Sequence, residues 1–147
     1  MMVFKSPVSV HLMLFKNHEI LLSKRKNTGF CDGFYSFPVG KLEDCESVLA
    51  AMKREAKEEI NIDLLDLEIV QVMNRLGEDI NRVDYFFIAE AYEGTIQNNE
   101  PDKCSELKWF DVDNLPMEII PYIREAILNY RNNIRFSLYG WGDVNEK

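Results

Sequence analysis

The sequence contains few of the residues on which several common functions depend. Its three cysteines, Cys31, Cys45 and Cys104, are far apart and form no C-x-x-C pair, so neither a thiolate zinc site nor a disulfide framework is expected. Its two histidines, His11 and His18, lie near no plausible serine or cysteine partner, and there is no G-x-S-x-G motif. One thiol could be a nucleophile, but we interpret all three as structural.

Long apolar runs and an excess of positive charge are also missing. No stretch approaches the roughly 18–20 apolar residues that span a bilayer. The first residues lack the apolar stretch and the cleavage site of a signal peptide. The net charge of −8 argues against a nucleic-acid polymer as partner, because that interface needs clustered lysine and arginine. We therefore expect a cytoplasmic protein that binds neither a membrane nor a nucleic-acid polymer.

The overall composition is ordinary for one folded domain. The chain has 147 residues, of which 46% are hydrophobic and 29% charged, enough for one substantial core. No internal repeat, low-complexity tract or linker interrupts it. Residues 1–147 are therefore expected to form a single domain.

Strands and helices are interspersed along the predicted order of elements. Apolar and β-branched residues predict strands at residues 8–15, 20–25, 67–73, 83–91 and 107–110. A turn at 16–19 would join the first two strands as a hairpin. Strong helix formers predict a helix at 47–60 that ends at Asn61, and a second helix at 119–130 that begins near Pro121. This order predicts an α/β fold with a mixed sheet packed against helices.

The glutamates of the first helix do not follow the pattern of a solvated face. With Val48 at zero and about 100° per residue, an apolar arc that should face the core holds Val48, Met52, Ala56, Leu49 and Ile60. Glu55 and Glu59 fall about 20° to either side of Val48, and Glu58 lies at the edge of the arc. The opposite side collects Lys53, Lys57, Ala50 and Arg54.

Two carboxylates on an apolar face carry two penalties. A lone buried carboxylate is costly unless it is paired or protonated, and like charges one turn apart repel each other. A divalent cation between Glu55 and Glu59 would relieve both, and oxygen ligands favour Mg²⁺ or Mn²⁺ over Zn²⁺. We therefore predict a metal site on this helix, with an acidic solvated face as the alternative.

Gly40, Glu46 and the segment Arg54–Ile62 resemble the Nudix box, G-x5-E-x7-R-E-U-x-E-E-x-G-U, where U is apolar. Every charged position is present at its required separation, and Asn61 replaces the last glycine. Val39 replaces the first glycine of the usual P-G-G-K-x-E lead-in. The resemblance continues downstream and covers about residues 8–130. It implies a Nudix-type α/β/α sandwich with a mixed β-sheet between helices, and a Mg²⁺-dependent hydrolase, for which Mn²⁺ could substitute.

The resemblance also implies roles for the residues that hold the metal. Glu55 and Glu59 match the principal metal ligands. Glu58 matches a position that assists metal binding or acts as a base, and the carbonyl of Gly40 matches a backbone ligand. Such a cation would also let a chain of charge −8 bind an anionic substrate.

Three further positions complete the expected site. Arg54 matches the residue that forms an ion pair with Glu46 and holds the loop against the helix. Glu100 matches an acidic residue that some relatives supply from a distant loop, and Glu93 and Glu106 are alternatives to it. The candidate catalytic residues are therefore Glu58, Glu59 and Glu100.

The loop before the box supplies the candidate substrate contacts. Phe30, Tyr35 and Phe37 could stack on a nucleobase or pack in the core. Arg25, at the end of the second strand, could bind phosphates or be a solvated charge, and Lys41 is a further candidate.

The aromatic tail from about residue 136 to 142 has three open roles. It could pack over the sheet, cover the substrate or meet a second subunit, so a homodimer is left open. No residue pattern in the chain separates these roles.

The leading hypothesis is hydrolysis of a diphosphate bond in a nucleoside diphosphate derivative. The simplest substrate would be a nucleoside triphosphate, oxidised or not, cut to monophosphate and pyrophosphate, as in MutT-like members. The enzymatic alternative is ADP-ribose or a nucleotide sugar, because loops other than the box choose the substrate. The non-enzymatic alternatives are a ligand-sensing Nudix domain and a structural acidic helix.

Overall fold

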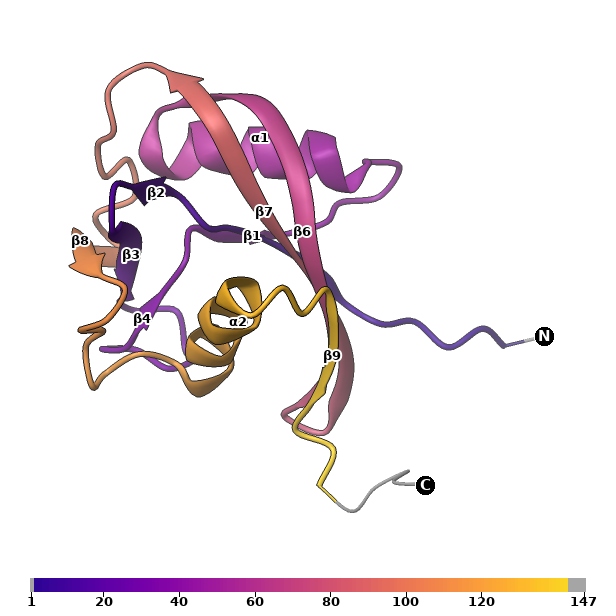
Figure 1. The fold of residues 1–147 in the computed structure, drawn as a ribbon. Helices are drawn as coiled ribbons and strands as arrows, with labels where there is room; N and C mark the ends of the chain where they lie inside the picture. Colours follow the sequence, from indigo (N-terminus) through magenta and orange to yellow (C-terminus); the bar gives the residue numbers. More distant parts are fainter. Residues whose placement is uncertain (1, 143–147) are drawn as a thin grey trace.

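Two β-sheets lie between two helices in the computed structural model, which describes residues 2–142 (Figure 1). The five-stranded sheet has the order β5 (Val39–Lys41), β1 (Val8–Leu12), β7 (Ile80–Glu93), β6 (Asp63–Gly77) and β9 (Phe136–Tyr139). Its β1–β7 and β6–β9 pairs are parallel and its other pairs antiparallel. In the second sheet β3 (Glu19–Arg25) pairs antiparallel with β2 (Phe15–Lys16), β4 (Tyr35–Ser36) and β8 (Cys104–Asp111). The predicted α/β sandwich with a mixed sheet is confirmed.

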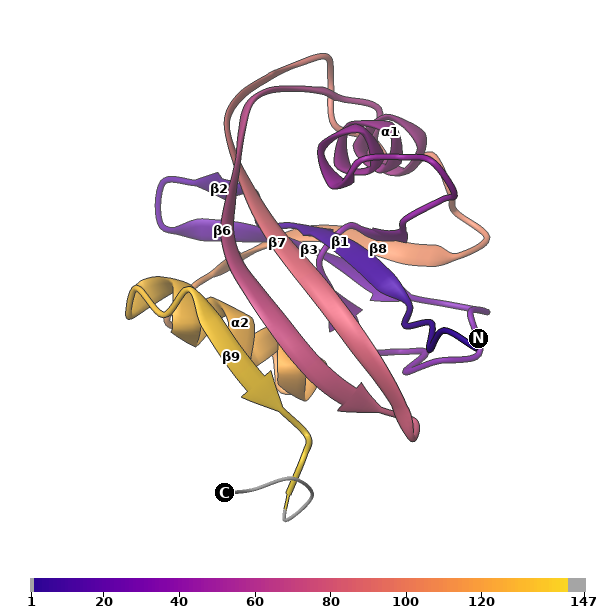
Figure 2. The same ribbon diagram turned by 90° about the vertical axis from the view of Figure 1, so that its right-hand side faces the viewer.

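The two helices cover opposite faces of these sheets, as Figure 2 shows. Helix α1 (Val48–Ile60) packs on a cluster that includes Leu12 and Phe87, and α2 (Pro121–Arg131) packs on a cluster that includes Met13 and Phe86. Successive strand side chains point to opposite faces, so neighbouring residues such as Phe86 and Phe87 enter different clusters. Both faces of the sheets are therefore buried.

The predicted first hairpin is only partly right. The segment predicted as one strand at 8–15 divides between the two sheets, because Met13 donates its N–H to Phe87 O while the Leu14 carbonyl accepts from Leu21 N. Only β2 and the start of β3 form the hairpin. The sequence does not reveal where the chain passes from one sheet to the other, because the residues on both sides of this point are apolar and buried.

The central hairpin is longer than predicted. Strands β6 and β7 extend well beyond 67–73 and 83–91 and join through Glu78 and Asp79, which have φ of 54° and 61°. Two successive residues with positive φ make the tight turn that suits antiparallel strands. The sequence lacks the Asn-Gly or Asp-Gly signal of such a turn, so the extension was missed.

Helix α1 begins and ends where the sequence predicts. The side chain of Ser47 caps its start by accepting from Ala50 N at 3.1 Å, and Asn61 ends it in the left-handed conformation, with φ of 66°. The prediction that Leu49 faces the core is wrong, because its side chain is 45% exposed. Leu49 lies in the first turn of the helix, next to the exposed Ala50, whereas Ala51 and Met52 are buried.

The aromatic tail packs on the sheet. Strand β9 pairs in parallel with β6 at the sheet edge, and Trp141 donates its indole N–H to Asn74 O at 3.0 Å. No helix within residues 2–142 combines the length and the apolar character needed to cross a bilayer.

Candidate active site

A cleft of about 750 Å³ opens beside α1, and its walls come from both sheets and both helices. Six carboxylates line it: Glu43, Glu55, Glu58, Glu59, Glu78 and Glu100. Arginines from β3, β6 and β7 line it as well: Arg25, Arg75 and Arg82. The cleft therefore presents charges of both signs to a ligand.

Glu59 is the most enclosed carboxylate of this group. Its Oε1 accepts from Val39 N at 3.4 Å, whereas its Oε2 is buried and has no hydrogen-bond partner within residues 2–142. Glu55 is also half-buried, and Glu58 is exposed. A buried carboxylate oxygen without a donor is costly in a metal-free protein, so its surroundings suit a bound cation.

The absence of a side chain at Gly40 leaves the space that the carboxyl group of Glu55 occupies. Gly40 lies on β5, opposite Val10 of β1, and a Cβ at this position would overlap the Glu55 carboxyl group. A glycine is therefore needed here for close approach and not for an unusual φ. The backbone of β5 and the side chain of Glu55 meet at the wall of the cleft.

Arg54 connects α1 to the loop that precedes it. Its Nε and Nη2 donate to the two oxygens of Glu46 at 2.7 and 3.0 Å, and Nη2 also donates to Lys41 O at 3.2 Å. Its Nη1 donates to Glu55 Oε1 at 2.8 Å and to Glu58 Oε2 at 3.2 Å. One guanidinium therefore orients two cleft carboxylates and holds the loop against the helix.

The carboxyl groups of the cleft shift one another's protonation. Burial, the largest cause, raises the pKa of Glu59 well above its ordinary value, and the nearby Glu55 and Glu100 raise it further. Burial also raises the pKa of Glu100, with Lys103 lowering it and Glu55 raising it. Without a cation, Glu59 thus keeps its proton to a higher pH in the folded protein than in an unfolded chain.

This retained proton predicts how the stability of the metal-free protein depends on pH. A raised carboxyl pKa means that the folded state binds more protons, so the contribution is complete below the ordinary glutamate pKa and is lost as pH rises through the raised pKa. In EDTA, we expect the free energy of unfolding by urea to fall as the pH rises above the ordinary glutamate pKa. Glu59→Gln should flatten this decline, because it removes the titrating group. An equal decline in the variant would contradict the expectation.

Gly40→Ala should impair the metal site while leaving the fold intact. The added methyl group displaces the Glu55 carboxyl group, which can move because it ends a flexible side chain. We expect turnover to fall by roughly 10–100-fold, the size of effect seen when metal ligands lose their orientation. The free energy of unfolding should change by less than about 1 kcal/mol. Steady-state kinetics measure the turnover, and urea unfolding measures the stability. Unchanged turnover would show that the close approach of Gly40 and Glu55 does not matter for the site.

The loop after β7 brings one of three candidate acids to the cleft. Backbone bonds from Asn99 N to Glu59 O at 3.0 Å and from Gln97 N to Ile60 O at 3.1 Å attach this loop to the end of α1. Glu100 therefore lines the cleft. Glu93 is exposed on β7, and Glu106 on β8 accepts a hydrogen bond from the hydroxyl of Tyr35. Neither of these two alternatives lines the cleft with the other carboxylates.

The candidate substrate contacts divide into two groups. Arg25, Phe30 and Lys41 line the cleft. Tyr35 does not, because its ring packs edge-on against Phe110 in the second sheet. Phe37 also contributes to the cleft lining, but it is 1% exposed and its ring packs edge-on against Phe86 in the core. The sequence leaves packing and stacking both open for these rings; Tyr35 and Phe37 show the packing contacts, and stacking of Phe30 on a nucleobase stays a proposal.

Sequence reasoning missed a buried polar cluster behind the cleft. Asp84 is fully buried, and it accepts from Arg75 Nε at 2.7 Å and contacts His11 Nε2 at 3.2 Å. The guanidinium of Arg75 lies 3.7 Å from the ring centre of Tyr122. The sequence signal for this cluster was a charged residue of each sign, Arg75 and Asp84, at inward positions of two otherwise apolar strands.

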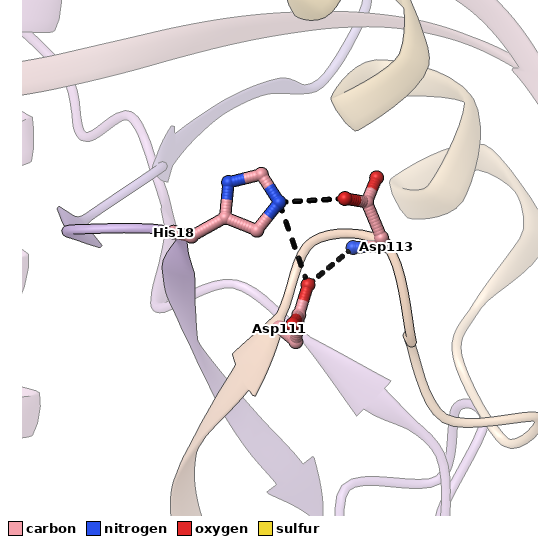
Figure 3. Close-up of side chains that lie close together, drawn as sticks. All are labelled: His18, Asp111 and Asp113. Carbon is pink, nitrogen blue, oxygen red and sulfur yellow. Dashed lines mark hydrogen bonds and ion pairs between the residues drawn. The ribbon is translucent and has the colours of Figure 1, made fainter.

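A second group of possible metal ligands lies on the surface, away from the cleft lining. His18, Asp111 and Asp113 point toward one another at the turn before β3 and the end of β8 (Figure 3). Among residues 2–142 they form the one group of three ligand atoms within 4.8 Å of one another. All three are exposed, and Arg131 already pairs with Asp113 at 2.7 Å. Ion pairing therefore accounts for this group without a metal.

The fold and the cleft define the class of protein, an α/β/α sandwich whose acidic helix lines a cleft beside several arginines. The NUDIX domain model matches residues 5–130, and the chain belongs to the Nudix family. The crystal structure of a MutT NUDIX hydrolase from Burkholderia pseudomallei aligns with a TM-score of 0.79 and 28% identity, over 85% of this chain and 98% of that one.

Two curated relatives are longer than this chain. The 8-oxo-dGDP phosphatase NUDT18 of Danio rerio is 29% identical over 130 residues, and the ADP-ribose pyrophosphatase of Methanocaldococcus jannaschii is 32% identical over 111 residues. The alignments include 84% and 74% of this chain, but span 39% and 64% of the relatives.

Proposed function

We propose that this protein is a Mg²⁺-dependent hydrolase of a diphosphate bond in a nucleoside diphosphate derivative. The observation that carries the proposal is Glu59 Oε2, which is buried and accepts no hydrogen bond from the described residues, while its carboxyl group lies within hydrogen-bond reach of that of Glu55. An all-oxygen donor set of this kind suits a hard cation such as Mg²⁺, with Mn²⁺ as a substitute.

The ligands we assign are the side chains of Glu55 and Glu59, assisted by Glu58, and the carbonyl of Gly40. When bound, Mg²⁺ would neutralise phosphate charge and lower the pKa of an attacking water. The other groups of the chain act around that centre. Arg54 fixes the position of Glu55 and Glu58, and through Glu46 it holds the loop in place.

Proton transfer needs a carboxylate that faces the cleft. Glu58, Glu59 and Glu100 are the candidates, because each lines the cleft and can accept a proton from water. The raised pKa of Glu100 makes it a stronger base than an exposed glutamate. Arg25 and Lys41 lie where they can bind phosphate oxygens, and Phe30 offers an aromatic face to an organic group.

A nucleoside triphosphate, oxidised or not, is the substrate we favour, with monophosphate and pyrophosphate as products. Relatives named as 8-oxo-dGTP diphosphatases support it, whereas the relative named 8-oxo-dGDP phosphatase supports an oxidised nucleoside diphosphate. The second candidate is ADP-ribose or a nucleotide sugar, favoured by the relative named ADP-ribose pyrophosphatase.

The test is a panel of nucleoside triphosphates, oxidised nucleotides, ADP-ribose and nucleotide sugars, each assayed with Mg²⁺ and with EDTA. We expect Mg²⁺-dependent release of a nucleoside monophosphate, and chromatography of the products identifies the bond that is cut. Binding of a panel member without turnover would favour the ligand-sensing alternative. Turnover that persists in EDTA would contradict the metal site.

A further inference from the structure

Strand β9 leaves one edge of the five-stranded sheet open, as Figure 2 shows. It pairs with β6 on one side, and no other segment of residues 2–142 pairs with it on the other side. The strand, Phe136–Tyr139, contains no proline and no charged residue, which are the residues that commonly protect an exposed strand edge from pairing. The edge is therefore free to accept a further strand.

The backbone of β9 directs two N–H and two C=O groups toward this open edge. Arg135 O accepts from Val72 N at 2.9 Å, on the β6 side. Peptide groups alternate in direction along a strand, so Ser137 directs its N–H and C=O to β6 as well. Phe136 and Leu138 therefore direct theirs away from β6, where no strand of residues 2–142 lies to pair with them.

The same two residues carry the exposed apolar side chains of the strand. Ser137 faces α2, because Asn129 donates to its Oγ at 3.2 Å. Side chains alternate along a strand, so Phe136 and Leu138 point to the other face, where they are 61% and 65% exposed. Apolar side chains beside unpaired backbone groups mark a surface that binds another chain.

This edge is complementary to a second copy of itself. Residues that lie directly opposite each other in an antiparallel pair share a face of the sheet, so Phe136 can lie opposite the partner's Leu138 around a two-fold axis at Ser137. Among the registers with this property, the one centred on Ser137 pairs both residues that direct their backbone groups outward. Each apolar side chain then contacts an apolar side chain of the partner.

Charge does not oppose this register. Arg135 is the one charged residue in the sequence 134–142. In the register centred on Ser137 it lies opposite the partner's Tyr139, an aromatic ring that can accept a cation on its face, and away from the partner's Arg135. A second copy of the chain is therefore the partner that fits this edge in register, apolar face and charge.

We propose that β9 pairs antiparallel with β9 of a second copy, so that the two five-stranded sheets join into one continuous sheet. Phe136 and the partner's Leu138 exchange both of their N–H···O=C bonds, and their side chains pack together. The area buried by two such short edges is on the order of 1,000 Å², which is typical of a weak, reversible dimer. The inference is independent of the proposed function, because β9 contributes no residue to the cleft lining.

Sedimentation velocity of the whole chain at about 10–500 µM tests the association, because a weak dimer has a Kd in this range. We expect the wild type to change from monomer to dimer across these concentrations. Leu138→Lys places a charge in the apolar contact and should weaken the dimer by more than about tenfold, with the thermal stability unchanged.

Leu65→Lys is the matched control, because Leu65 is a 40% exposed leucine on β6 of the same sheet. It should leave the dimer unchanged. A dimer that survives Leu138→Lys would overturn the proposal. A wild type that stays monomeric would also overturn it, and would leave the edge to a peptide of another protein.

Cysteine cross-linking tests the register, in Cys45→Ser protein because Cys45 is exposed. Ser137→Cys lies opposite its own copy, with Cβ atoms about 4.5–5.5 Å apart, and should form a covalent dimer with diamide as oxidant. Arg135→Cys is more exposed but lies four positions out of register with its own copy, roughly 13 Å along the strand, and should link poorly. Linking that is as strong in Arg135→Cys, or absent in Ser137→Cys, would overturn the proposed pairing.

Discussion

Glu59→Gln is expected to reduce the Mg²⁺-dependent hydrolysis of the protein's substrate by about 10³-fold or more. Loss of a ligand to a catalytic cation removes several kcal/mol of transition-state stabilisation, and about 4 kcal/mol corresponds to 10³ in rate. Glutamine keeps the size and the Oε1 contact of Glu59 with Val39 N but loses the negative charge. Steady-state rates on a substrate found in the panel measure the effect.

The same variant should be folded and more stable than the wild type in EDTA near neutral pH. Glutamine is neutral at every pH, so the variant avoids the cost of ionising a buried carboxyl group beside Glu55. Glu93→Gln is the matched control, because Glu93 is exposed at the end of β7, and its rate should be close to that of the wild type. A Glu59→Gln protein as active as the wild type would show that the metal site is assigned wrongly.

Arg75→Met is expected to lower the free energy of unfolding by about 3–5 kcal/mol, because it leaves a buried carboxylate without its main partner. Burial alone would raise the pKa of Asp84, but the hydrogen bonds and charges of His11 and Arg75 hold that pKa at about 2. Methionine fills much of the arginine's volume, so the loss reports on charge more than on packing. Urea unfolding near pH 7 measures it.

A double variant separates the ion pair from the space that it fills. Arg75→Met with Asp84→Leu removes both charges, and replacing a buried pair by apolar groups is often neutral or stabilising. We therefore expect the double variant to regain most of the stability lost by Arg75→Met. A loss of less than about 1 kcal/mol in Arg75→Met would contradict the role of the buried pair.

The helix that carries the box could be predicted from sequence because its signals are local. Ser47 and Asn61 determine its ends, and helical spacing alone placed Glu55 and Glu59 toward the apolar side. Leu49 was placed wrongly because helical spacing gives the direction of a side chain but does not show whether another element packs against it.

The remainder of the cleft depends on contacts between distant segments. Arg75 and Asp84 lie nine positions apart on two strands, and their pairing depends on the register of β6 and β7. Glu100 reaches the cleft because backbone bonds attach its loop to the end of α1. Neither arrangement follows from periodicity, so this part of the cleft could be found only in three dimensions.

Calorimetric titration of Mn²⁺ into the metal-free protein tests the central claim most directly. The account predicts that Glu55→Gln with Glu59→Gln weakens binding by more than about 100-fold, since even groups that only orient metal ligands contribute 10–100-fold. His18→Ala, which disrupts the surface group of Asp111 and Asp113, should leave the affinity unchanged. Binding that survives the loss of both glutamates, or that is lost in His18→Ala, would contradict the account.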